Sequence, residues 1–188
     1  MRVIAGKHRG RKLVAPEGDE VRPTAARARE ALFDILMHGR LSDGPAYEDA
    51  IVLDAFAGTG AFGLEALSRG ARFVTFLEND REARAVLKEN IAALGETQHA
   101  AILSGDATRP PRATGPCALA FLDPPYREDL AAPALVALGK SGWLADNALV
   151  IVELAAREDF ELPNGFTLLD ERRYGAARFV FLRYNHDT

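Results

Sequence analysis

Four carboxylates lie where the chain could use them for chemistry, because each is at or just beyond the end of a short apolar stretch. They are Asp54, Glu78, Asp106 and Asp123. The apolar stretches are typical of buried parallel strands, whose carboxyl ends meet at one edge of a sheet, where open α/β proteins bind ligands. One such acid is usually a helix cap or a solvated turn residue. Four in succession are hard to explain as caps alone, and they predict a binding site at this edge.

Asp123 begins the tetrapeptide Asp-Pro-Pro-Tyr, whose prolines turn the chain out of the sheet because proline has a fixed φ and no N–H. A carboxylate and the Pro124 carbonyl can accept both hydrogens of an exocyclic amine, which frees the nitrogen lone pair for attack on a methyl group held in line with it. The Tyr126 ring can stack on a base that has left its helix or loop. The predicted catalytic residues are Asp123, Pro124, Pro125 and Tyr126. The alternative is a plain strand-terminating turn with Tyr126 in the core.

A glycine-rich loop follows one predicted strand and precedes a helical pattern. Gly58, Gly60 and Gly63 have the spacing of the dinucleotide fingerprint, in which glycine lets the backbone approach a ligand and the helix N-terminus supplies N–H donors. The spacing alone is a weak signal. It is strengthened by Glu78, which can accept hydrogen bonds from both ribose hydroxyls, and by Asp106, which can accept one from an adenine amine.

Two cofactors would use such a loop. NAD is one, but Asp54 is an odd neighbour for a pyrophosphate, and an NAD enzyme has no evident need for Asp-Pro-Pro-Tyr. S-adenosylmethionine carries a sulfonium and an ammonium group, so nearby acids favour its binding. We therefore expect S-adenosylmethionine as the cofactor, bound by Asp54, Phe56, Ala57, Gly58, Thr59, Gly60, Glu78, Asn79, Asp106, Ala107 and Asp123.

Strands and helices alternate along the chain. The predicted strands are 51–53, 73–77, 100–103, 118–122 and 148–153, followed by a closing antiparallel hairpin of 166–169 and 179–182. Helical patterns begin after Thr24, a plausible N-cap, after the glycine loop, after Asn79 or Asp80, and near residue 130. This alternation predicts an α/β fold with a parallel sheet and helices on both faces.

The N-terminal segment is basic, whereas the rest of the chain is acidic. Residues 1–40 contain nine Lys or Arg against five acids, and the remainder contains 14 against 22. Weak alternation at 2–5 and 13–16 predicts two short strands around a basic turn, which together form an arm. Nucleic acid is one partner that would favour such a face, although a solvated basic terminus explains the charge equally well. The candidate RNA-binding residues are Arg9, Arg11, Lys12, Arg22, Arg27 and Arg29.

Length and composition limit the remaining possibilities. A chain of 188 residues with 48% hydrophobic and 27% charged residues is ordinary for a globular protein. We expect a basic arm and helix over 1–45, packed on a main domain over 46–188. No apolar run is long enough to span a membrane. The single cysteine and the four scattered histidines do not suggest a metal site, so we expect no membrane, no metal and a cytoplasmic location.

The chain as a whole, from about residue 2 to 184, resembles the bacterial small-subunit ribosomal RNA guanine-N2 methyltransferases. The Asp-Pro-Pro-Tyr motif is similar to motif IV of amino-methyltransferases. The other matching segments lie in the basic arm, the next helix, the glycine loop and its helix, and before the fifth strand; they are 2–6, 9–13, 22–33, 54–60, 63–70 and 142–144.

This resemblance implies a Rossmann-like, class I S-adenosylmethionine-dependent methyltransferase fold, with a mostly parallel seven-stranded sheet. It also implies methylation at N2 of one specific guanine in 16S RNA, within an assembled or assembling 30S particle. The family also tolerates phenylalanine at the position of Tyr126, which favours stacking over a role for the hydroxyl. Adenine-N6 and cytosine-N4 methyltransferases share the tetrapeptide, but they usually need a larger recognition domain. An NAD-dependent oxidoreductase and a non-catalytic RNA-binding assembly factor are the remaining alternatives.

Overall fold

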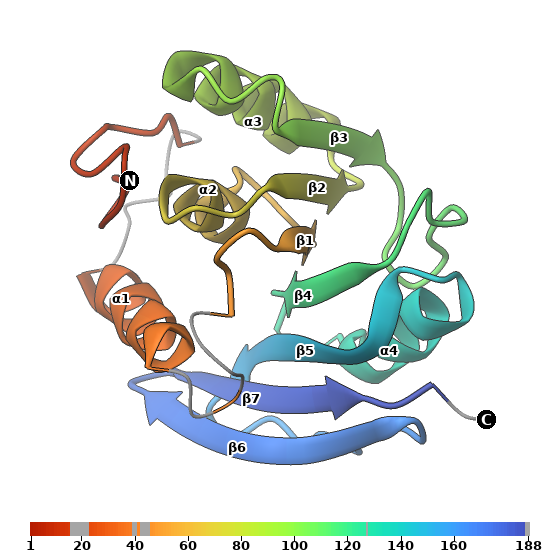
Figure 1. Cartoon of the computed structure of the whole chain (residues 1–188). Coiled ribbons are helices and arrows are strands. Elements are labelled where there is room, and N and C mark those ends of the chain that lie inside the picture. The colour runs from red at the N-terminus through yellow and green to blue at the C-terminus, as the bar shows by residue number, and fades with distance from the viewer. Residues whose placement is uncertain (16–22, 39–40, 42–45, 127, 187–188) are drawn as a thin grey trace.

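The computed structural model describes residues 1–15, 23–38, 41, 46–126 and 128–186 (Figure 1). The predicted RNA contact of Arg22 lies outside these residues, and so does the capping side chain of Thr24. Within the described part of the chain, no helix is long and apolar enough to cross a membrane.

The described residues form one seven-stranded sheet with the order β3-β2-β1-β4-β5-β7-β6. Strands β1 to β5 are parallel, and β7 is antiparallel to both β5 and β6. The chain moves outward from β1 to β3 and then returns to the other side of β1 with β4. Ligands of open α/β sheets bind at such a switch point, here the carboxyl ends of β1 and β4. The strands are β1 Ile51–Ala55, β2 Phe73–Glu78, β3 Ala100–Ser104, β4 Cys117–Leu122, β5 Leu144–Ala155, β6 Phe166–Tyr174 and β7 Ala177–Tyr184.

The helices cover both faces of the sheet, which confirms the predicted layers (Figure 1). One core cluster joins the arm and the first three helices to alternate residues of the strands, such as Leu119 and Phe121 of β4. The second cluster joins the fourth helix to the intervening residues, such as Ala120 and Leu122. This alternation arises because successive side chains of a strand point to opposite faces. The helices are α1 Pro23–Met37, α2 Ala61–Ser68, α3 Arg81–Leu94 and α4 Ala131–Lys140.

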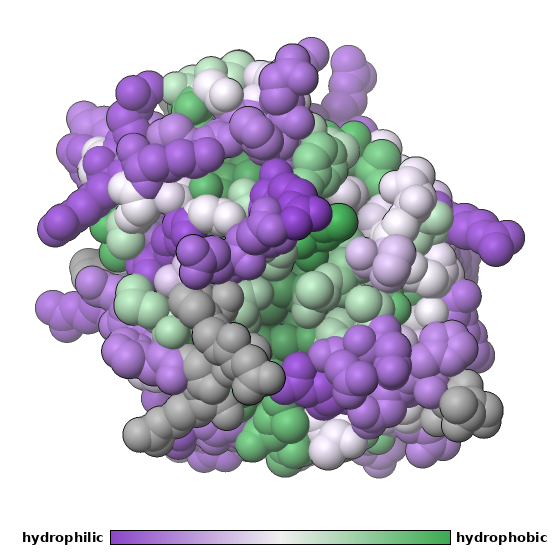
Figure 2. Space-filling view, in the orientation of Figure 1, coloured by the Kyte–Doolittle hydropathy of each residue, from purple (hydrophilic) through white to green (hydrophobic). Residues whose placement is uncertain are grey.

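The outer surface follows from these layers. Hydrophilic side chains cover much of the periphery of the face shown in Figure 2, whereas apolar residues gather in its middle, where Figure 1 places the sheet. The helix ends also follow local sequence: Asp80 caps α3 by accepting from the N–H of Ala83 at 2.7 Å, and Gly95 ends this helix with a φ of 75°.

The fifth strand is longer than the sequence predicts, 12 residues rather than six. The apolar pattern is interrupted by Asp146 and Asn147, which are exposed. A register irregularity between Cys117 and Leu119 of β4 accommodates them, and Asn147 takes a φ of 63°. The strand therefore resumes its pairing with β4 at Leu149.

The arm pairs as predicted, but more briefly. Arg2 and Lys12 form an isolated antiparallel bridge rather than two strands, and the Val3 N–H donates to the Arg11 carbonyl at 3.0 Å. The arm docks on α2, where the buried carboxylate of Glu65 accepts from the N–H groups of Ile4 and Ala5 at 2.8 and 3.0 Å. Polar contacts to the main domain therefore help to stabilise the arm, which has few apolar residues.

Candidate active site

Four neighbouring strands reach the same level at the carboxyl edge of the sheet. Ala55 of β1 pairs with Leu77 of β2 and with Leu122 of β4, which in turn pairs with Val152 of β5. The residue after each of these positions therefore lies at the same level of the edge. Those residues are Phe56, Glu78, Asp123 and Glu153, so the structure brings two of the predicted acids together with a third that was not predicted.

The loop after β1 has an unusual backbone. Phe56, Gly58 and Gly60 have φ values of 58°, 53° and 87°, in the left-handed region that a bulky residue such as phenylalanine rarely adopts. Strained residues of this kind concentrate at ligand-binding sites, where the surrounding structure holds them in place. Here the N–H of Ala57 donates to the carbonyl of Leu77, at 3.2 Å, and ties the loop to β2.

The glycines of the loop serve different purposes. A Cβ at Gly58 would meet nothing within 4 Å, so this part of the loop faces open space and can admit a ligand. A Cβ at Gly60 would lie 2.4 Å from Leu87 of α3, and one at Gly63 would lie 2.3 Å from Phe76 of β2. The predicted close approach to a ligand therefore fits Gly58, whereas Gly60 and Gly63 allow close packing inside the protein.

Asp54 and Glu78 hold the loop in this shape. The carboxylate of Asp54 is buried and accepts from the N–H of Gly63 at 2.8 Å, and burial raises its pKa to about 8. The carboxylate of Glu78 accepts from the N–H of Gly58 at 2.6 Å through Oε2 and from that of Asp80 at 2.7 Å through Oε1. Each carboxylate oxygen has a second lone pair, so Glu78 can still accept from a ligand hydroxyl.

The remaining predicted cofactor residues follow β2 and β3. The exposed carboxylate of Asp106 accepts from the N–H and hydroxyl of Thr108, both at 2.8 Å, and these bonds lower its pKa. Only Oδ1 makes these bonds, so Oδ2 is left to accept from a ligand. Asn79 is exposed, and its carbonyl accepts from Arg84 at 2.6 Å, whereas Ala107 is buried.

Asp123 continues the pairing of β4 with β1, since its N–H donates to the carbonyl of Ala55 at 3.4 Å. Burial raises the pKa of this carboxyl well above its usual value, and the neighbouring carboxyls of Glu153 and Asp54 raise it further. The Tyr126 side chain is 44% exposed, which contradicts the alternative that it belongs to the core. Its hydroxyl donates to Oε1 of Glu153 at 2.7 Å. Of the two prolines between them, the first is buried and the second is exposed.

Glu153 is the site residue that the sequence analysis missed. It lies inside β5, which continues to Ala155, but it also ends an apolar run in the same way as the other acids. That repeated pattern was the signal that could have identified it. Burial raises the pKa of Glu153, an effect that the hydrogen bond from Tyr126 and the charge of Arg29 oppose.

The predicted RNA-binding residues that the structure describes differ in exposure. Arg9, Arg11 and Lys12 are exposed on the arm, where Arg11 also donates to the carbonyl of Ala93 at 2.6 Å, and Arg27 is exposed on α1. Arg29 is only 5% exposed, because it points from α1 into the protein beneath the arm.

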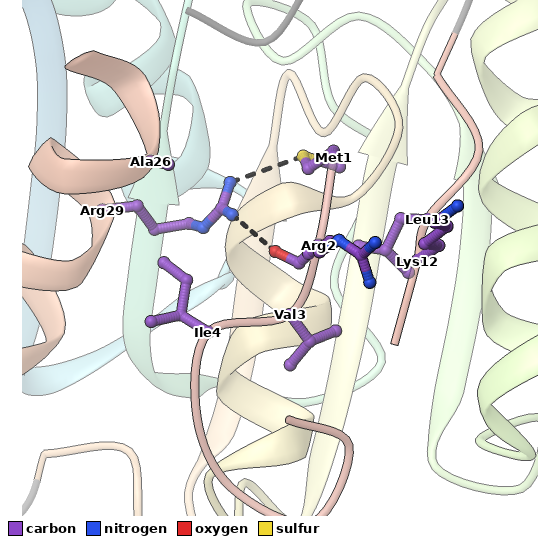
Figure 3. A pocket seen from close by; sticks show the side chains of 8 residues that line it. All are labelled: Met1, Arg2, Val3, Ile4, Lys12, Leu13, Ala26 and Arg29. Carbon is purple, nitrogen blue, oxygen red and sulfur yellow. Dashed lines mark hydrogen bonds between the residues drawn. The ribbon is translucent and has the colours of Figure 1, made fainter. Parts of the chain in front are cut away.

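Arg29 instead fixes the start of the chain. Its guanidinium donates to the carbonyl of Arg2 at 3.0 Å and to the sulfur of Met1 at 3.4 Å (Figure 3). Its Nε is buried without a hydrogen-bond partner, and burial lowers its pKa. These residues line a cavity of about 450 Å³ between the arm and α1. The structure thus makes Arg29 a buried link between α1 and the arm rather than a surface residue.

Comparisons with known proteins place this geometry in a family. Residues 1–183 match the family model described as Conserved hypothetical protein 95. Ribosomal RNA small subunit methyltransferase D of Escherichia coli is 42% identical over 181 residues, covering 95% of this chain and 87% of the relative. The protein of the same name from Haemophilus influenzae is 37% identical over 183 residues, covering 95% and 91%.

A solved structure supports the same assignment. The putative methyltransferase yhhF from Escherichia coli superposes with a TM-score of 0.85 at 36% identity, covering 100% of this chain and 99% of the other. The predicted Rossmann-like methyltransferase fold is therefore confirmed. With matches over nearly its whole length, the chain belongs to the family of the ribosomal RNA small subunit methyltransferase D proteins.

Proposed function

We propose that this protein transfers a methyl group from S-adenosylmethionine to the exocyclic N2 amine of a specific guanine in small-subunit ribosomal RNA. The observation that carries the proposal is the position of Asp123. It lies at the end of β4, bonded through its N–H to Ala55 and thus beside the loop that begins at Phe56. An amine held by Asp123 would therefore lie next to a ligand held by that loop. The family membership agrees with this activity.

The residues at the edge of the sheet fit S-adenosylmethionine. This molecule supplies an electrophilic methyl group on a sulfonium centre, and it also carries an ammonium group, two ribose hydroxyls and an adenine amine. The chain offers an open backbone at Gly58, a carboxylate with free lone pairs at Glu78 and an exposed carboxylate oxygen at Asp106. We assign Glu78 to the ribose and Asp106 to the adenine. Asp54 shapes the loop by accepting from the N–H of Gly63.

We assign the Asp-Pro-Pro-Tyr segment to binding and orienting the base that accepts the methyl group. Asp123 and the carbonyl of Pro124 accept the two amine hydrogens, and the exposed ring of Tyr126 stacks on the base. Positioning of this kind can lower a barrier by roughly 7–11 kcal/mol at best. Once methylated, the nitrogen becomes acidic, and the raised pKa of Asp123 suits this carboxylate to take the proton that leaves.

We assign the exposed cations of the arm and α1 to binding the RNA backbone. Arg9, Lys12 and Arg27 can neutralise phosphates without adopting a fixed geometry. We propose an assembled or assembling 30S particle as the substrate. A comparison of methylation rates on particles and on the naked RNA tests this point, and faster reaction of the naked RNA would contradict it.

The activity itself is tested with tritiated S-adenosylmethionine and undermethylated small subunits, followed by digestion of the RNA to nucleosides. We expect the label in N2-methylguanosine. Asp123→Asn should abolish transfer but keep the affinity for S-adenosylhomocysteine, measured by calorimetry, because the loop at Gly58 is unchanged. Arg72→Gln, on the exposed ion pair with Asp49, serves as a control that should behave as the wild type. Label in N6-methyladenosine or N4-methylcytidine would contradict the choice of base, and cofactor binding without transfer would indicate an assembly factor.

A further inference from the structure

Asp123 and Glu153 present their carboxylates on the same face of the sheet. In β4, Leu119 and Phe121 belong to the core cluster on the side of α1, so the alternation of a strand directs Asp123 to that side. In β5, Ile151 belongs to the same cluster and directs Glu153 in the same way. Strands β4 and β5 are paired neighbours, about 4.8 Å apart. One base edge can span two acceptors at such a separation.

The two oxygens of Glu153 have different surroundings. Oε1 accepts the hydroxyl of Tyr126, a member of the Asp-Pro-Pro-Tyr segment. Within the described part of the chain, Oε2 has no hydrogen bond from a protein group. The charge of Arg29 acts on this carboxylate and favours its ionised form. Burial nevertheless raises the pKa of this carboxyl, and the hydrogen bond from Tyr126 and the charge of Arg29 oppose that rise. Glu153 is therefore held by one oxygen, while its other oxygen remains available beside Asp123.

The nucleobases differ in the group next to their exocyclic amine. In guanine, the N2 amine is adjacent to the N1–H donor. In adenine and cytosine, the amine is adjacent to an unprotonated ring nitrogen, which is an acceptor. A carboxylate oxygen beside Asp123 would accept the N1–H of guanine, whereas it would repel the lone pair that adenine or cytosine presents there.

From this placement we propose that Glu153 is the specificity-determining residue of the site and accepts the N1–H of the target guanine through Oε2. Tyr126 positions this carboxylate through Oε1 while its ring stacks on the base. The inference rests on the proposed function, because it concerns the base that enters the same site. It adds a reason, in the residues of this chain, for the choice of guanine over the other amine-bearing bases.

The test uses 2-aminopurine, which keeps the amine at position 2 but has a lone pair instead of a hydrogen at N1 and lacks the O6 oxygen of guanine. Small-subunit particles are reconstituted with RNA that carries either guanine or 2-aminopurine at the position labelled by the wild type. The ratio of kcat/KM for the two substrates is compared between the wild type and Glu153→Gln, whose amide can donate to the 2-aminopurine nitrogen. We expect the preference for guanine to fall at least about tenfold in the variant. The other differences between the two substrates are the same for both enzymes. The change in the ratio therefore reports on residue 153.

Two further variants keep the inference testable. Tyr126→Phe frees Oε1 but leaves the carboxylate, so it should raise KM and keep the preference. Glu153→Asn replaces Glu153→Gln if circular dichroism shows that the glutamine variant does not fold. If kcat/KM falls by the same factor on both substrates, or on neither, the ratio is unchanged. That result would overturn the inference and leave Glu153 with a structural role. Failure of the wild type to methylate guanine would instead contradict the proposed function itself.

Discussion

The side-chain amide of Asn90, on α3, donates to the carbonyl of Val14 in the arm and to the carbonyl of Thr59 in the glycine loop, both at 3.1 Å. Its oxygen accepts from the N–H of Val14 at 2.7 Å. The side chain is 1% exposed, so water cannot replace these partners. One buried residue thus joins the arm that carries basic side chains to the loop assigned to the cofactor. The arm and the loop should therefore depend on each other.

We predict that Asn90→Leu, which is similar in volume but cannot form hydrogen bonds, lowers the free energy of unfolding by about 2–4 kcal/mol. Three hydrogen bonds are lost, and the backbone groups of Val14 and Thr59 lose their partner. The same change should weaken binding of S-adenosylhomocysteine, because Thr59 loses its support. Urea unfolding and calorimetry measure the two effects. As a control, Asn185→Leu removes an exposed hydrogen bond from the Asn185 amide to the hydroxyl of Thr167. It should lower the free energy of unfolding by about 0.5 kcal/mol or less. Equal costs for the two variants would contradict the prediction.

The glycines of the loop allow binding and stability to be separated. Gly58→Ala should lower the free energy of unfolding by about 1–2 kcal/mol, because alanine disfavours the left-handed backbone at this position. It should also weaken binding of S-adenosylhomocysteine at least tenfold, because its Cβ projects into the open space above the loop. Gly60→Ala should lower the free energy of unfolding by more than Gly58→Ala does, since its Cβ would lie 2.4 Å from Leu87. Gly95→Ala has the same backbone penalty at the end of α3 and open space around it, so it serves as the control. Binding by Gly58→Ala at the strength of the control would disprove the assignment.

The sequence predicts the parallel sheet and the positions of its acids well, because both follow from local patterns. An apolar run followed by an acid is visible without knowledge of the fold, and parallel strands bring such acids to one edge. Glu78 and Asp123 are accordingly found where they are expected. The same reasoning misses Glu153, because β5 continues past it and no proline or glycine marks the end of the run.

Side-chain burial that depends on distant partners is harder to predict. Arg29 has the sequence context of an exposed cation in the first turns of a helix, but its partners are Met1 and Arg2. Nothing in the spacing of α1 shows that the arm will cover this position. The packing roles of Gly60 and Gly63 likewise depend on Leu87 and Phe76, which come from other elements.

Asp54 should make stability depend on pH. Its pKa is about 8 in the folded protein and near 4 in the unfolded chain, so between these values the folded state holds a proton that the unfolded state has lost. The free energy of unfolding that this carboxyl contributes therefore falls as the pH rises from about 4 to about 8. Asp54→Asn keeps an acceptor for Gly63 and has no proton to lose. We expect the variant to gain stability relative to the wild type as the pH rises through this range.

Urea unfolding of both proteins from about pH 5 to about pH 8 measures this difference. Asp123 and Glu153 also have raised pKa values and are present in both proteins. Asp54→Asn removes one of the charges that raise the pKa of Asp123, which changes the difference in the same direction. A difference in stability that stays constant over the range would show that Asp54 is ionised throughout.

The exposed cations of the arm should contribute to RNA affinity through charge alone. Arg9→Gln and Lys12→Gln together should weaken binding to small-subunit RNA and reduce the slope of log affinity against log salt by about 1 for each charge removed. Arg72→Gln removes one charge from the exposed ion pair with Asp49, just before β2, and should leave the slope unchanged. Filter binding over a range of salt concentrations measures the slopes, and calorimetry with S-adenosylhomocysteine should show unchanged cofactor affinity. If the double variant keeps the wild-type slope, the arm does not contact phosphates, and its docking through Glu65 and Asn90 is then its main role.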